Sequence, residues 1–198
     1  METEHLSQAF PLHQNMRLSK LHLWLKPYML FISSFYRRIE FMSVDYDIAK
    51  VLARYVRAAD RRDGTAMAEL FLTEGKVTMF YNDGGTPQPL GELVGREAIA
   101  NAVTKMMKPH PPRGWSHHTT HDAIINVEGD TATLDAQFIV YNVVGDLKPE
   151  GGWPVGASGA QGTVKPIESG YYRPTLKQVD GRWMIETLQI ILDLPVAF

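Results

Sequence analysis

The chain contains no cysteine among its 198 residues. This absence excludes thiol nucleophiles, zinc–thiolate centres, iron–sulfur clusters and disulfide scaffolds. A chain of this length buries most of the surface that its unfolded form exposes, so it needs no such cross-links. We therefore expect a fold that is held together by an ordinary hydrophobic core.

The chain also lacks an excess of positive charge. It has 20 Lys and Arg residues against 22 Asp and Glu residues, which gives a formal net charge of −2 at pH 7. Proteins that bind duplex nucleic acid need a basic surface that neutralises the phosphate backbone. We therefore expect no nucleic-acid partner.

The apolar runs are too short to span a membrane. The most apolar stretch, residues 21–36, is divided by Lys26 and Pro27 and is closed by Arg37 and Arg38. A spanning helix needs about 20 apolar residues. The first residues are acidic rather than basic, unlike those of a secretory signal. These features predict a cytoplasmic protein with no membrane partner.

Residues 1–42 differ in pattern from the rest of the chain. Residues 1–41 contain no glycine and no regular apolar period. The first regular helical spacing begins at Ser43, directly after Met42. We expect residues 1–42 to be an N-terminal extension, disordered or outside the core, and residues 43–198 to form one domain.

Motifs for phosphate, nucleotide or metal binding are missing as well. The sequence has no glycine-rich phosphate loop, dinucleotide fingerprint or nucleophile elbow. Three histidines lie close together in sequence, but His117 and His121 would be about 13 Å apart along a strand at about 3.3 Å per residue. One ion would have to lie about 2.1 Å from each nitrogen. We therefore expect no metal and no cofactor.

The sequence does contain a regular order of helices and strands. Apolar residues at helical spacing predict helices over residues 43–62, 66–71 and 96–107, with Asp63 as the N-cap of the second. Alternating residues predict strands over residues 76–81, 91–94, 117–127, 131–144, 169–179 and 182–194. Residues 82–89 are predicted as a loop, and residues 145–166, with six glycines and three prolines, as an irregular insertion. This order predicts an α+β fold with a mostly antiparallel sheet.

Four segments of the domain carry a family resemblance. They are YVRAADRRDGTAMAELF (residues 55–71), LVGREAI (93–99), HHTTHDAIINVEGDTATLDAQFIVY (117–141) and YYRPTLKQVDGRWMIETLQIILD (171–193). In this order they resemble the SnoaL-like branch of the nuclear transport factor two-like superfamily. The resemblance implies a cone-shaped barrel, in which a strongly curved, mostly antiparallel sheet packs on three N-terminal helices. It also implies a homodimer.

The chain departs from the family pattern in two places. Pro174 stands where the branch often has an acidic residue, and the insertion over residues 145–166 is longer than usual. The family includes polyketide cyclases, dehydratases, steroid isomerases and non-catalytic binders. The fold alone therefore does not give the reaction.

Two candidate catalytic residues lie on the first predicted helix. At 100° per residue, Tyr55 falls near the centre of the apolar stripe and Asp60 falls just past its edge. The dehydratases that the sequence resembles carry a Tyr and an Asp five residues apart on this helix. The alternative for Asp60 is a structural ion pair with Arg61 or Arg62, or a solvated position at the helix end.

A histidine at the start of the third long strand is the candidate acid–base group. Counting alternate residues back along the strand places His117 on the inward face, whereas the sequence pattern of the family that the chain resembles favours His118. A bulge near the start of the strand would reconcile the two. Both histidines remain candidates, and an exposed histidine at a strand end is the alternative for each.

Further aromatic and polar residues are candidates to line a substrate pocket. Small-molecule pockets usually combine aromatic walls with a few polar groups. The candidates stand near strand ends, and ordinary packing or surface exposure is the alternative for each of them: Trp115, Tyr141, Asn142, Tyr172 and Arg173.

Together these residues predict a cofactor-independent acid–base enzyme, a dehydratase, cyclase or isomerase, that acts on a cyclic, aromatic or polyketide-like small molecule. His117 or His118 would be the base, Asp60 would orient it or act as the acid, and Tyr55 would donate a hydrogen bond to a substrate oxygen. The reverse acid–base assignment fits the sequence equally. The alternative is a non-catalytic protein of the same fold, either a small-molecule binder or a subunit such as that of a ring-hydroxylating dioxygenase.

Overall fold

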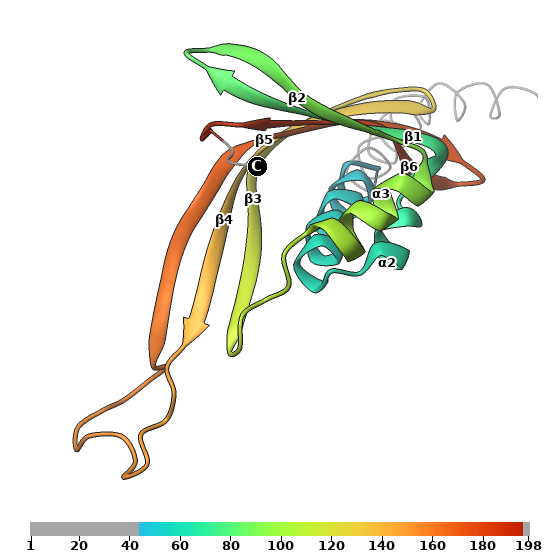
Figure 1. Ribbon diagram of the computed structural model, residues 1–198. Helices are drawn as coiled ribbons and strands as arrows, with labels where there is room; N and C mark the ends of the chain where they lie inside the picture. Colours follow the sequence, from blue (N-terminus) through green and yellow to red (C-terminus); the bar gives the residue numbers. More distant parts are fainter. Residues whose placement is uncertain (1–43, 196–198) are drawn as a thin grey trace, which may run out of the picture. The chain divides into compact units, whose positions relative to one another are not determined.

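The computed structural model describes residues 44–195 (Figure 1). The predicted N-terminal extension, residues 1–42, lies outside the described residues. Three helices and a six-stranded sheet make up the described part of the chain. Among residues 44–195, no helix combines the length and the apolar character that crossing a membrane requires.

The first helix covers residues 44–61 of the described chain and is called the long helix below. Its apolar stripe, which includes Ile48, Leu52 and Tyr55, is buried against the sheet, as its spacing predicts. The next helix, α2 (Gly64–Ala68), begins directly after Asp63, whose side chain accepts a hydrogen bond from the N–H of Ala66. Asp63 is therefore the predicted N-cap, and it starts α2 two residues earlier than the apolar spacing suggested.

The third helix changes its winding part of the way along. It begins as α3 (Arg96–Asn101) and continues as η1 (Ala102–Met106), a π-helical turn in which the ladder of hydrogen bonds widens. The prediction of one regular helix over residues 96–107 is wrong in this respect. Turns of this kind are rare and occur often at functional sites.

The six strands form a single sheet. They are β1 (Phe71–Asp83), β2 (Thr86–Val94), β3 (Gly114–Glu128), β4 (Thr131–Gly145), β5 (Gly162–Val179) and β6 (Arg182–Leu192). The strand order is β2-β1-β6-β5-β4-β3, and every pair is antiparallel except β1 with β6. The sheet is strongly curved but does not close, and the helices lie on its concave side (Figure 1). The predicted α+β fold with a mostly antiparallel sheet is confirmed.

Two predicted irregular regions are shorter in the structure. Residues 82–89 belong mainly to the hairpin of β1 and β2, which turns at Gly84 and Gly85 with positive φ angles of 58° and 92°. The proline-rich sequence of β2 is compatible with a strand because β2 lies at the edge of the sheet, where a missing N–H costs no ladder hydrogen bond. The irregular stretch between β4 and β5 runs over residues 146–161.

An aromatic cluster connects the long helix to the concave face of the sheet. Phe138 of β4 stacks on Tyr172 of β5 with ring centroids 4.1 Å apart. Tyr55 of the long helix meets Tyr172 edge-on at 5.4 Å and Phe71 of β1 at 6.3 Å. All four side chains are buried, so the helix cannot move relative to these strands without breaking well-packed contacts.

We expect Gly170→Ala to lower the free energy of unfolding by about 1–3 kcal/mol, the usual cost of overpacking a core. A Cβ atom at Gly170 would collide with the backbone oxygen of Ile191 and approach the Phe138 ring to 3.0 Å. Urea unfolding measures the difference. Gly151→Ala is the matched control, because nothing lies within 4 Å of its added Cβ atom. Equal stabilities of the two variants would contradict this packing.

Candidate active site

Asp60 lies in the last turn of the long helix and is buried, with a side chain that is 11% exposed. Hydrogen bonds from two side chains, those of His110 and Arg62, hold the backbone at the end of this helix. The His110 ring donates from Nε2 to the backbone oxygen of Asp60 at 2.7 Å. Arg62, which adopts a positive φ of 57°, donates to the backbone oxygens of Ala59 and Lys108 at 2.6 and 3.1 Å. The arginine thus bonds to backbone, and the ion pair of Asp60 is with a histidine instead.

That histidine is His118 of β3, whose Nδ1 lies 2.6 Å from Oδ1 of Asp60. The backbone N–H of His118 donates to both oxygens of the same carboxylate at 3.2 Å, and the hydroxyl of Ser116 donates to Oδ1 at 3.3 Å. Burial alone would raise the pKa of Asp60, but the hydrogen bonds and charge of His118, with the bond from Ser116, hold that pKa below its ordinary value. Asp60 is therefore an anion that these groups surround.

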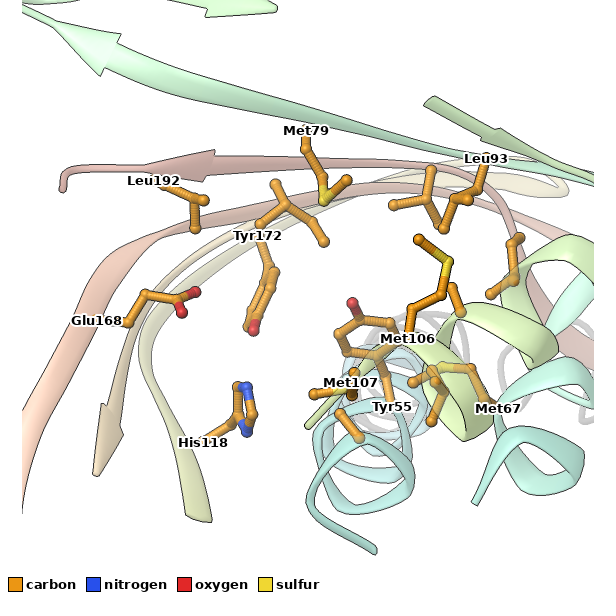
Figure 2. A pocket seen from close by; sticks show the side chains of 16 residues that line it. Tyr55, Met67, Met79, Leu93, Met106, Met107, His118, Glu168, Tyr172 and Leu192 are labelled. Carbon is orange, nitrogen blue, oxygen red and sulfur yellow. The ribbon is translucent and has the colours of Figure 1, made fainter. Parts of the chain in front are cut away.

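The ionised carboxylate fixes the orientation of the imidazole. Because a carboxylate only accepts hydrogen bonds, the proton of the bond to Asp60 must sit on Nδ1 of His118. Nε2 is then the nitrogen available to another molecule, and the ring faces the cavity (Figure 2). A histidine held in this way by a buried carboxylate is oriented to exchange a proton at Nε2.

The structure selects between the two candidate histidines. His117 is exposed and points to the opposite face of the sheet from His118, so the choice of His117 by alternation is wrong. The reason is a bulge: the register of β3 with β4 shifts between His121 and Ile124, and Asp122 has a positive φ of 52°. One extra residue there reverses which residues face inward on either side of it.

A cavity of about 420 Å³ lies between the concave face of the sheet and the helices. Its polar groups come from Tyr55, His118, Glu168 and Tyr172 (Figure 2). The rest of its wall is apolar and includes four methionines: Ala59, Met67, Val77, Met79, Leu93, Ile99, Ala102, Val103, Met106, Met107, Ile190 and Leu192. A few polar groups in an apolar wall are typical of a site for a small organic molecule.

The two tyrosines of the cavity are hydrogen-bond donors at any physiological pH. Burial, and then the nearby Glu168 carboxylate, raises the pKa of Tyr55 well above its ordinary value. Burial is also the main cause that raises the pKa of Tyr172, with smaller contributions from Tyr55, Glu168 and Asp60. Both phenols therefore stay protonated, and both hydroxyl groups point into the cavity (Figure 2).

Sequence reasoning missed Glu168, which lines the cavity from β5. The backbone register places His118, Val140 and Glu168 side by side across β3, β4 and β5. A signal was present: Glu168 continues, at every second residue, the buried face of β5 that Gly170, Tyr172, Pro174 and Leu176 form. The strand predicted over residues 169–179 starts one residue after Glu168, because the glycines and prolines of residues 145–166 indicate a loop.

The other predicted lining residues lie away from the cavity. Of the five, Tyr172 alone is part of its wall. Trp115 is 41% exposed and stacks on His110, and Arg173 pairs with Asp135 at 2.8 Å in solvent. Tyr141 and Asn142 are half-buried opposite His117 and Ser116, outside the cavity wall. Among residues 44–195, no three His, Asp or Glu side chains are grouped to hold a metal ion.

The fold agrees with a comparison with models of protein families. Residues 42–189 match the model of the SnoaL-like domain, and the chain belongs to this family. The resemblance of the four sequence segments is thereby confirmed. A comparison with curated proteins found no match.

Solved structures share the fold at low sequence identity. One, from Novosphingobium aromaticivorans, is provisionally identified as the beta subunit of an aromatic-ring-hydroxylating dioxygenase; it is 18% identical, with a TM-score of 0.58 over 79% of this chain and 94% of that one. Another from the same organism, an NTF2-like protein with a cystatin-like fold, is 21% identical, with a TM-score of 0.58 over 81% and 88%. A third, from Catenulispora acidiphila in complex with S-DNPA, is 18% identical, with a TM-score of 0.54 over 76% and 94%.

We expect Asp60→Asn to destabilise the protein near neutral pH by about 1.5–3 kcal/mol, the usual contribution of hydrogen bonds to a charged group. Because folding lowers the pKa of Asp60, its stabilisation is complete above the unfolded value of about 3.9 and is lost as the pH falls through the folded value. Urea unfolding between pH 3 and 8 should therefore show a difference from wild type that shrinks at the acidic end.

Asp135→Asn is the matched control for this series, because Asp135 forms an exposed ion pair with Arg173. Such pairs contribute at most about 1 kcal/mol. A difference for Asp60→Asn that stays constant down to pH 3 would show that the carboxylate is not held ionised by its partners.

Proposed function

We propose that this protein is a cofactor-independent acid–base enzyme, a dehydratase, cyclase or isomerase, that acts on a cyclic, aromatic or polyketide-like small molecule. The proposal rests on the buried Asp60–His118 pair, whose imidazole faces a cavity of about 420 Å³. Asp60 occupies Nδ1 of His118, so Nε2 is the nitrogen that a molecule in the cavity can reach, as a proton-transferring base requires.

In this proposal His118 removes a proton from the substrate through Nε2. The proton comes from a carbon next to a carbonyl group, and Asp60 stabilises the imidazolium that forms. Negative charge then develops on the carbonyl oxygen. Tyr55 and Tyr172 are placed to donate hydrogen bonds to that oxygen, since both hydroxyls point into the cavity and stay protonated.

The structural neighbours are compatible with a ligand-binding site, and they also suggest a non-catalytic function as an alternative to the enzyme. One neighbour was solved in complex with S-DNPA, and another is provisionally identified as a dioxygenase subunit. A non-catalytic small-molecule binder or subunit is therefore the second candidate function. The paired carboxylate and imidazole favour the enzyme, because binding alone does not require an oriented base.

We expect His118→Ala and Asp60→Asn each to lower turnover by about 10²-fold or more, the usual contribution of a positioned acid or base. The double variant should lose much less than the product of the two effects, because the residues act as one unit. The measurement is exchange of α-hydrogens for deuterium, by NMR in D₂O, on a panel of cyclic ketones of one to three rings that includes 2-decalone.

His117→Ala is the matched control and should keep nearly the wild-type exchange rate, since His117 points to the other face of the sheet. A panel on which the folded wild-type protein binds ketones but exchanges none of them would favour the non-catalytic function. Normal exchange by a folded His118→Ala variant would show that another group is the base.

The cytoplasmic location stays a prediction. We also propose a homodimer, in which the sheets of two protomers pair through their outer faces. The apolar side chains of β6 do not supply this interface, because Ile185, Leu188 and Ile191 are buried in the core. The outer face instead exposes Trp115 and Ile124 on β3, at 41% and 65%.

We expect light scattering at micromolar concentration to give the mass of a dimer. Ile124→Lys should shift the equilibrium toward the monomer, because a charge would be buried at the interface without a partner. Val155→Lys, at a fully exposed position of the irregular stretch between β4 and β5, is the control because it lies outside the sheet. A wild-type monomer at these concentrations would rule the dimer out.

A further inference from the structure

Glu168 brings a carboxyl group into the cavity that the Asp60–His118 pair does not use. It is the one acidic side chain among the sixteen residues that line the cavity. Its carboxyl makes no hydrogen bond or ion pair to another group within residues 44–195, although the side chain is half-buried. In Figure 2 it points into the same hollow as the His118 ring and the hydroxyl of Tyr172.

The sheet holds Glu168 at a fixed separation from His118. Val140 lies between them in the register of β3, β4 and β5, so their backbones are two strand spacings, or about 10 Å, apart. Both side chains extend from this row toward the helices. A substrate lying across the row would touch the imidazole with one carbon and the carboxyl with a group on the next carbon.

We propose that Glu168 is the general acid of this site: it protonates the hydroxyl group that leaves when His118 takes the proton from the neighbouring carbon. The reaction of the site is then the dehydration of an uncharged cyclic β-hydroxyketone. This inference rests on the proposed function, because it needs His118 to act as the base.

The step is balanced in atoms and electrons. His118 Nε2 takes the proton of the carbon next to the carbonyl, and the electrons of that C–H bond become the new carbon–carbon double bond. The C–O bond to the β-hydroxyl breaks, and the proton of the Glu168 carboxyl goes to the departing oxygen, which leaves as water. The imidazolium of His118 and the carboxylate of Glu168 remain, and one proton transferred between them through water restores the site.

The protonation state of Glu168 supports this role. Burial raises the pKa of the Glu168 carboxyl, and the charge of His118 opposes only part of the rise. The groups that face it are His118 on β3, Tyr55 on the long helix and Tyr172 on its own strand, with Asp60 behind His118. An acid must hold its proton at working pH, and a raised pKa keeps more of it protonated.

The cavity wall also indicates an uncharged substrate. Its lining residues include no lysine and no arginine, and its two phenols are neutral donors. A substrate with a carboxylate or phosphate inside this cavity would lose its hydration without gaining a cation as partner. A ketone and a hydroxyl, in contrast, match the phenols and the protonated carboxyl.

The test compares two reactions on one ring skeleton. Exchange of the α-hydrogens of 2-decalone in D₂O needs the base, whereas loss of water from 4-hydroxy-2-decalone needs the base and the acid. We expect Glu168→Gln to lower the rate of dehydration by about 10²-fold or more, and to lower exchange by less than about tenfold. The conjugated product is followed by its ultraviolet absorbance, and exchange by NMR.

Two further measurements separate an acid from a structural residue, and a control variant and a charged analogue accompany them. Glu168→Asp should recover at least about tenfold of the lost dehydration, because it restores a carboxyl group. The wild-type dehydration rate should fall as the pH rises through the pKa of Glu168, and Glu168→Gln should lose this dependence. Glu186→Gln, on an exposed position of β6, is the matched control and should leave both reactions unchanged. A ring-carboxylate analogue of the hydroxyketone should react at least about tenfold more slowly.

The outcomes distinguish the two proposals. If wild type exchanges 2-decalone but never dehydrates the hydroxyketone, the role of Glu168 is wrong and the base function stands. The role is also wrong if Glu168→Gln lowers both reactions equally or changes neither. If wild type catalyses neither reaction on any panel member, the proposed function fails and the role of Glu168 fails with it.

Discussion

The carboxylate of Asp60 joins two parts of the chain that are far apart in sequence, the end of the long helix and the start of β3. It sits at the end of the long helix, and it accepts hydrogen bonds from Ser116 and from both the backbone and the ring of His118. A buried carboxylate without these donors would be strongly unfavourable, so the helix end and the start of β3 must stay together. The cavity has its shape because this junction holds the helix against one end of the curved sheet.

The same junction explains why the imidazole is well placed for chemistry. Its orientation depends on regular elements on both sides, a helix and a strand, and the backbone around Asp60 is further held by His110 and Arg62. Sites supported in this way keep their geometry more accurately than sites on loops. The phenol of Tyr55 comes from the same helix one and a half turns earlier, so one rigid element positions two of the functional groups.

Much of this arrangement could be predicted from the sequence, and the failures have physical causes. Tyr55 and Asp60 were found because a helix has a fixed angular period, and the long helix is regular over their whole separation. His117 and His118 could not be separated, because the bulge near Asp122 changes the inward face of β3 and alternation cannot cross an extra residue. Glu168 was missed because the composition before it is typical of a loop, although β5 extends through it.

The same contrast between local and non-local signals applies to the fold. The order of helices and strands follows from periodicity and turn residues, which are local. The π-helical turn of η1 packs against α2, which is distant in sequence, and no local pattern in residues 102–106 predicts this turn. The β1–β2 hairpin extends further than its proline-rich sequence indicates, because the position of β2 at the edge of the sheet is a property of the whole topology.

The methionines of the cavity divide its wall into two parts of different stiffness. Met67, Met79, Met106 and Met107 come from α2, β1 and the end of η1, whereas the polar groups come mainly from β3 and β5 (Figure 2). Methionine side chains are unbranched and adapt to the shape of what they contact, whereas the polar groups are held in fixed positions. We therefore expect a site that is tolerant of variation in the carbon skeleton of its ligand and strict about the positions of its oxygen atoms. Relatives that change only these methionines would accept new skeletons while keeping the same reaction.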